Sequence, residues 1–130
     1  MKERDKIAYW IEAANYDMKS AIYMQKSGRY VYTAFLCQQA IEKYLKALYI
    51  GKMSNEAPRT HNLVYLAGLL EIKINDKDME LLTGLTSFYI EGRYPTYKQT
   101  ISRIINRVKA DTILKETRRF IKWLKSNPPS

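Results

Sequence analysis

Helical periodicity dominates the order of apolar and polar residues, and the alternation typical of strands is weak throughout. Between residues 4 and 27, apolar side chains recur every three or four positions. They form one stripe of Ile7, Trp10, Ile11, Ala14, Met18, Ala21 and Ile22. The stripe predicts an amphipathic helix with one face in a core, and Gly28 is a suitable residue to end it.

A second helix is predicted from about Tyr30 to Ile50, ended by Gly51. Its main apolar face consists of Ala34, Cys37, Ile41, Tyr44, Leu45 and Leu48. Phe35 and Leu36 fall on other sides, so this helix is apolar around much of its circumference. A helix of this kind usually lies at the centre of a bundle, and we expect the two long helices to be antiparallel.

Two shorter helices are expected in the middle of the chain. Thr60 is a reasonable N-cap for a helix from His61 to about Glu71. Asn75 resembles the N-cap of a further helix, which should end near residues 92–94 because Pro95 disfavours helical backbone before it. The apolar stripe of that helix is Leu81, Leu82, Leu85, Phe88 and Tyr89.

Two apolar sets in the last third differ in phase, so one straight helix cannot bury both. The first is Ile101, Ile104, Ile105 and Val108, and the second is Ala110, Ile113, Leu114, Thr117, Ile121 and Leu124. We therefore predict a break at Asn106, a good N-cap residue, and a last helix over about 107–125. The sequence predicts an all-α, up-and-down bundle of about five helices, with one domain over residues 1–126 and a frayed tail at 127–130.

Positive charge is concentrated near the C-terminus of the chain. The 130 residues carry 22 Lys and Arg against 13 Asp and Glu, a formal net charge of +9. Residues 98–130 hold nine of the basic and two of the acidic side chains, and the predicted outer face of the last helix carries Lys115, Arg118, Arg119 and Lys122. This concentration of positive charge favours an anionic partner. A helix face that is simply exposed to solvent would have the same composition.

Most catalytic and metal-binding templates require residues that the chain lacks. Cys37 is the one cysteine and His61 the one histidine, which excludes disulfide frameworks, multi-histidine metal sites and histidine-based triads within one chain. No cofactor or metal is therefore expected. Cys37 is predicted to be a small buried side chain, whereas His61 has either a structural role or a role in a site. No apolar run is long enough to cross a membrane and no secretory signal precedes the first helix, so we expect a cytoplasmic protein.

Eleven tyrosines stand out beside three Phe and two Trp. Tyr9, Tyr16 and Tyr23 are seven residues apart and share the face of the first helix opposite its apolar stripe. A row of this kind suits contact with a second copy or another protein, because each ring offers apolar area and a hydroxyl. Packing inside the bundle is the alternative.

Two cations and two tyrosines cluster where the fourth predicted helix must end. Arg93, Tyr94, Tyr97 and Lys98 surround Pro95. Arg and Tyr together could hold a phosphate and stack on a base. A fixed helix exit with Arg93 in a structural salt bridge explains the segment equally well.

The chain resembles the HEPN family of small helical domains in three stretches. The first helix has the family's pattern of Trp10, Ala14, Asp17 and Ala21, and residues 38–47 (QQAIEKYLKA) resemble its most recognisable helix. His61-Asn62-Leu63 and Arg93-Tyr94-Pro95 match two later elements. Their joint occurrence is more specific than any one of them.

The resemblance implies a helical bundle, commonly dimeric, that is often encoded beside a minimal nucleotidyltransferase as a toxin–antitoxin pair. Many members are ribonucleases that use an Arg and a His four to six residues apart. In this chain the positions that follow Arg93 at that spacing are Lys98, Gln99 and Thr100, so the usual motif is not intact.

Three functions remain open at this point. The first is a homodimeric HEPN-like protein that binds a nucleotide, RNA or a nucleotidyltransferase through Arg93, Tyr94, Tyr97 and Lys98, with little or no catalysis. The second is a metal-independent ribonuclease toxin with a rearranged site drawn from Arg93, Lys98 and His61. The third is a structural adaptor that docks another protein on its tyrosine row.

Overall fold

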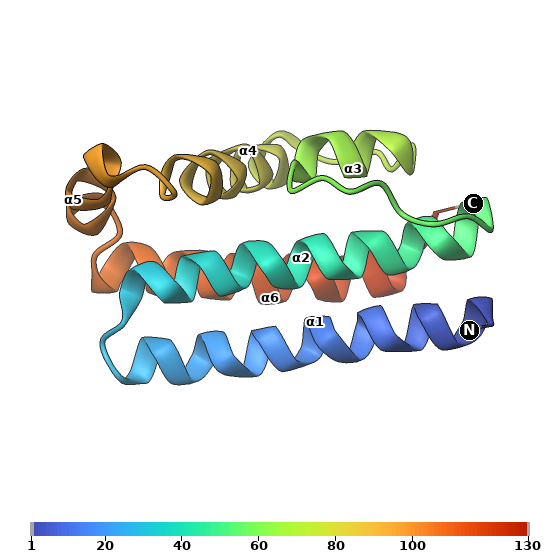
Figure 1. The fold of residues 1–130 in the computed structure, drawn as a ribbon, viewed down its shortest axis with the longest axis horizontal. Coiled ribbons are helices and arrows are strands. Elements are labelled where there is room, and N and C mark those ends of the chain that lie inside the picture. Colours follow the sequence, from blue (N-terminus) through green and yellow to red (C-terminus); the bar gives the residue numbers. More distant parts are fainter. Residues whose placement is uncertain (1, 130) are drawn as a thin grey trace.

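A computed structural model describes residues 2–129 of the chain, with the side chains of residues 95–99 excepted. Within this range the protein is built from six α-helices arranged as a bundle, as Figure 1 shows. In chain order they are α1 (Glu3–Lys26), α2 (Tyr30–Met53), α3 (Leu63–Leu69), α4 (Asp76–Glu91), α5 (Pro95–Ile104) and α6 (Arg107–Ser126). The all-helical prediction is confirmed.

Helix α2 is the centre of the bundle, because all five other helices pack against it. Helices α1 and α2 run antiparallel along each other and are joined by a short turn (Figure 1). Gly28 in that turn has φ +80°, a conformation that favours glycine. The apolar positions around α2 are therefore buried on several sides, as its composition predicts.

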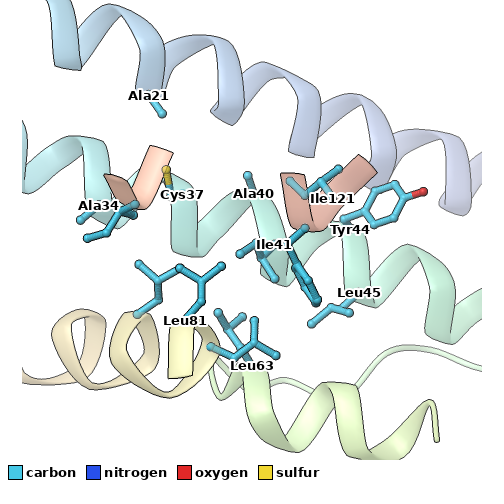
Figure 2. Close-up of a cluster of buried hydrophobic side chains, with 14 of the residues drawn as sticks. Ala21, Ala34, Cys37, Ala40, Ile41, Tyr44, Leu45, Leu63, Leu81 and Ile121 are labelled. Carbon is cyan, nitrogen blue, oxygen red and sulfur yellow. The ribbon is translucent and has the colours of Figure 1, made fainter. Parts of the chain in front are cut away.

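Side chains from four helices meet in the core around α2. Figure 2 shows Ala21 of α1, Leu63 and Leu81 of α3 and α4, and Ile121 of α6 facing Ile41 and its neighbours on α2. Cys37 is fully buried among them, which confirms the prediction. The stripe predicted for the last helix is buried as well, from Ala110 to Leu124.

Asparagine side chains cap three of the helices. Asn75 and Asn106 accept hydrogen bonds from the backbone amides three residues later, at 2.8 and 2.9 Å, which confirms both predicted starts. Asn62 does the same for α3, at 3.0 Å. The predicted cap at Thr60 is wrong: its hydroxyl accepts instead from the Asn62 amide, in a turn that precedes the helix.

Two helix boundaries differ from the prediction for physical reasons. Gly51 lies inside α2, which continues to Met53 and ends at Ser54 with left-handed backbone (φ 51°). Pro95 ends the preceding helix as expected but also opens α5, because proline fits the first helical position, where no amide donor is needed. None of the described helices is long and apolar enough to cross a membrane.

Candidate functional site

A line of buried polar side chains runs along α2 on its side toward the loop before α3. Gln38, Glu42 and Lys46 are spaced four residues apart, which places them on one helix face. All three are buried. Glu42 accepts a hydrogen bond from Gln38 Nε2 at 3.1 Å and forms an ion pair with Lys46 Nζ at 3.0 Å. Burying these charges is tolerable because they are paired.

His61 is anchored to this line by its backbone and by its ring. Its carbonyl oxygen accepts from Gln38 Nε2 at 2.9 Å, and its Nδ1 lies 2.8 Å from Glu42 Oε1. A carboxylate only accepts hydrogen bonds, so Nδ1 carries the proton and the lone pair of the neutral ring is on Nε2. The His61 side chain is 44% exposed, so a ligand can reach it.

The ring of Tyr89 on α4 connects His61 with Arg93. The centroids of the His61 and Tyr89 rings are 5.1 Å apart, and the guanidinium carbon of Arg93 lies 5.3 Å from the Tyr89 centroid. Arg93 lies in the turn just after α4, four residues beyond Tyr89, and a cation over a tyrosine ring is a favourable contact. Two residues far apart in the sequence are thus brought to one place.

Arg93 and Tyr89 also line a hollow of about 470 Å³. Its other lining residues are Met24, Tyr32, Phe35, Leu36, Gln39 and Gly92. Phe35 makes edge-to-face contacts with Tyr32 and Tyr89, so the hollow has an aromatic wall and a cation at its edge. A Cβ atom at Gly92 would overlap the Phe35 ring, so glycine is required for this wall to close.

The structure joins some of the predicted site residues and separates others. Arg93 and His61 both contact Tyr89. Arg93 forms no ion pair with any residue whose side chain is described, so the alternative of a structural salt bridge at Arg93 gains no support. Tyr94 is exposed at the N-cap of α5. Tyr97 and Lys98 belong to α5, but their side chains lie outside the described residues.

Glu42 and Tyr89 were missed as site residues. The signal for Glu42 was available, because three polar residues at a spacing of four are unusual on a helix that is apolar on several sides. The sequence pattern places Tyr89 on the core stripe of its helix, and only the tertiary structure shows that its ring contacts both His61 and Arg93. Throughout the described residues, no group of three or more His, Cys, Asp or Glu is placed to hold a metal ion.

The fold and this site together define a class of helical domain, and comparison with known proteins identifies it. The sequence profile of the HEPN domain matches residues 7–127, so the chain belongs to the HEPN family. A search among functionally curated proteins finds no match.

Two crystal structures share the fold. TT1696 from Thermus thermophilus has a TM-score of 0.78 and 21% identity, covering 93% of this chain and 97% of that one. ST0689, described as an archaeal HEPN homologue, has a TM-score of 0.70 and 23% identity, covering 93% and 96%. At these identities the likeness concerns the fold alone.

Proposed function

We propose that this HEPN protein binds a nucleotide, either free or within RNA, at the hollow beside Tyr89. The observation that carries the proposal is that Arg93 and His61 both contact the ring of Tyr89, and that Arg93 and Tyr89 line an aromatic hollow. A cation, an imidazole and aromatic walls are the groups that recognise phosphate and base.

Each part of the hollow has a counterpart in a nucleotide. The guanidinium of Arg93 can donate two parallel hydrogen bonds to phosphate oxygens. The rings of Tyr32 and Phe35 offer faces and edges for a base, since every base has a stacking surface. A volume of about 470 Å³ lies within the usual range for small-molecule sites. Tyr94, Tyr97 and Lys98 follow directly in the chain and are proposed to extend the contact along RNA.

Binding of nucleotides and of a uridine oligoribonucleotide, measured by calorimetry and fluorescence anisotropy at low salt, tests this function. Arg93→Ala should weaken binding about 10- to 100-fold, because a charge-assisted pair with phosphate is lost. Arg4→Ala is the matched control, since Arg4 is exposed in the first turn of α1, and the N-terminus of α1 lies at the end of the bundle opposite α5 (Figure 1). The proposal fails if the wild type binds neither ligand, or if both variants weaken binding equally.

A second candidate, metal-independent RNA cleavage, is favoured by the pairing of His61 with Glu42. A buried carboxylate that orients Nδ1 leaves Nε2 able to accept the proton of a ribose 2′-hydroxyl while its oxygen attacks the adjacent phosphorus and Arg93 stabilises the phosphate. The bond from phosphorus to the 5′-oxygen breaks, a 2′,3′-cyclic phosphate forms, and the 5′-oxygen leaves with a proton from the imidazolium or from water. Incubation of the purified protein with RNA should then give fragments in the presence of a chelator, and His61→Ala should give none. Intact RNA with wild-type protein excludes this candidate.

The cellular setting proposed for this chain follows from its family. We propose a cytoplasmic homodimer that works beside a minimal nucleotidyltransferase, as in a toxin–antitoxin pair. Support comes from membership of the HEPN family. Light scattering at micromolar concentration tests the dimer, and a nucleotidyltransferase in the neighbouring reading frame, co-purifying with this protein, would test the pair.

A further inference from the structure

A second hollow, larger than the one beside Tyr89, lies between α1 and α6. This α1/α6 groove has a volume of about 690 Å³. Its lining residues are Glu12, Asn15, Tyr16, Met18, Lys19 and Ile22 of α1 and Arg118, Ile121, Lys122 and Lys125 of α6. At 1.5 Å per residue, the lining of α1 from Glu12 to Ile22 extends for about 15 Å, which is the length of nearly three turns of a helix.

The floor of the groove is apolar and its rim is cationic. Met18, Ile22 and Ile121 form the floor, and the first two are partly exposed. Four exposed cations, Lys19, Arg118, Lys122 and Lys125, surround it against one acidic residue, Glu12. Apolar side chains next to unopposed charge are typical of a surface that meets a partner.

Among the described residues, the four rim cations have no ion-pair partner, in contrast to Arg119 and Lys115 of α6. Arg119 pairs with the buried Asp78, and Lys115 pairs with Asp111 at 3.0 Å. Within the described part of the chain, Lys19, Arg118 and Lys122 form no ion pair, and Lys125 makes only a contact of 5.9 Å with the ring of Tyr44. Four cations along one groove are therefore available to an external anionic group.

The exposed tyrosine row lies on the same helix as the groove. Tyr16 lines the groove and is 73% exposed, and Tyr9 and Tyr23 one heptad away on either side are also exposed. The alternative that these rings pack inside the bundle is wrong. Exposed tyrosines beside an apolar floor extend the contact area available on this side of the bundle.

We infer that the α1/α6 groove binds an acidic amphipathic helix of another protein. The apolar residues of such a helix would pack on Met18, Ile22 and Ile121, while its carboxylates pair with the cations of the rim. A second copy of this chain is a poor occupant, because two cationic rims would face each other in a protein of net charge +9. The apolar floor favours a helix over a nucleic-acid backbone, which needs phosphate contacts alone.

The inference does not depend on the proposed function, because the groove shares no lining residue with the hollow beside Tyr89. The probe is a fluorescein-labelled synthetic helix of about 18 residues, with leucines along one face and glutamates on both sides of it. A scrambled peptide of the same composition keeps the charge but lacks the apolar face. A fluorescein-labelled uridine oligonucleotide is the third probe.

Fluorescence anisotropy should show saturable binding of the amphipathic peptide, weaker at high salt, and much weaker binding of the scrambled one. Arg118→Glu with Lys122→Glu should reduce the affinity at least about tenfold. Lys109→Glu with Lys115→Glu, which makes the same charge change elsewhere on α6, should change it less than about threefold. Lys122→Glu alone is a milder variant, and thermal unfolding confirms that each variant is folded.

Three results would overturn the inference. The first is no saturable binding of the amphipathic peptide by wild-type protein at low salt. The second is equal loss of affinity in the groove variant and in the control variant. The third is tighter binding of the oligonucleotide that displaces the peptide and depends on Arg118 and Lys122, which would assign the groove to nucleic acid.

Discussion

Replacement of Glu42 by glutamine should destabilise the protein more than its small change in shape suggests. Gln38 Nε2, Lys46 Nζ and His61 Nδ1 all point hydrogens at the Glu42 carboxylate, at 3.1, 3.0 and 2.8 Å. A glutamine at this position has one acceptor oxygen and an amide that itself donates. At least one donor would therefore face another donor, and the Lys46 ammonium would lose its counter-charge while buried.

The size of the effect follows from the two losses together. An unsatisfied buried donor costs about 1–3 kcal/mol, and breaking a buried ion pair costs about 3–5 kcal/mol. We expect Glu42→Gln to lower the free energy of unfolding by at least about 3 kcal/mol, the lower limit for loss of the ion pair alone.

Urea unfolding followed by far-UV circular dichroism measures this change. Asp111→Asn is the control, because it breaks the more exposed pair with Lys115 and should change the free energy of unfolding by less than about 1 kcal/mol. A second substitution, Lys46→Met in the Glu42→Gln background, should restore part of the stability by removing the unpaired charge. Equal effects of Glu42→Gln and Asp111→Asn would refute the reasoning.

Three further predictions use the same unfolding assay. Gly92→Ala should destabilise by about 1–3 kcal/mol because its methyl group meets the Phe35 ring, whereas Gly84→Ala, with open space around it, should be neutral or stabilising. Burial raises the pKa of Cys37 from 9.0 to about 12, so the thiol stabilises the fold below pH 9 and this contribution declines as the pH rises toward 12. Wild-type stability should therefore fall more steeply than that of Cys37→Ala over this range, and parallel curves would contradict it. Asn106→Ala should lower the free energy of unfolding by about 1 kcal/mol, because the N-cap hydrogen bond of α6 is lost. An unchanged free energy of unfolding would contradict the role of Asn106 as the N-cap.

The helices that the sequence predicts well are those with local signals. Asn75 and Asn106 cap their helices through hydrogen bonds to amides three residues away, so residue type and spacing are sufficient. Pro95 marked the end of α4 correctly, yet the same residue begins α5. A proline can follow the end of one helix or occupy the first position of the next. The phase of the isoleucines that follow Pro95 does not by itself decide between these two arrangements.

The candidate site could be predicted only in part, because its geometry depends on contacts between distant segments. Arg93 and His61 were both candidates from the sequence, but their meeting depends on the loop before α3 packing against α2 through Gln38. The contact of Tyr89 with both residues depends in turn on how α4 packs on α2. The spacing of residues in the sequence predicts neither the packing of this loop on α2 nor that of α4 on α2.

The central claim is that Arg93, Tyr89 and His61 form one nucleotide site, and the single histidine makes a direct test possible. The two carbon-bound imidazole protons of His61 give resolved signals in a ¹H–¹³C NMR spectrum without any assignment among histidines. We predict that adding the nucleotide shifts these signals with the same dissociation constant as binding measured by calorimetry, and that Arg93→Ala abolishes the shift at equal concentration. Binding that leaves the His61 signals unchanged would contradict the account.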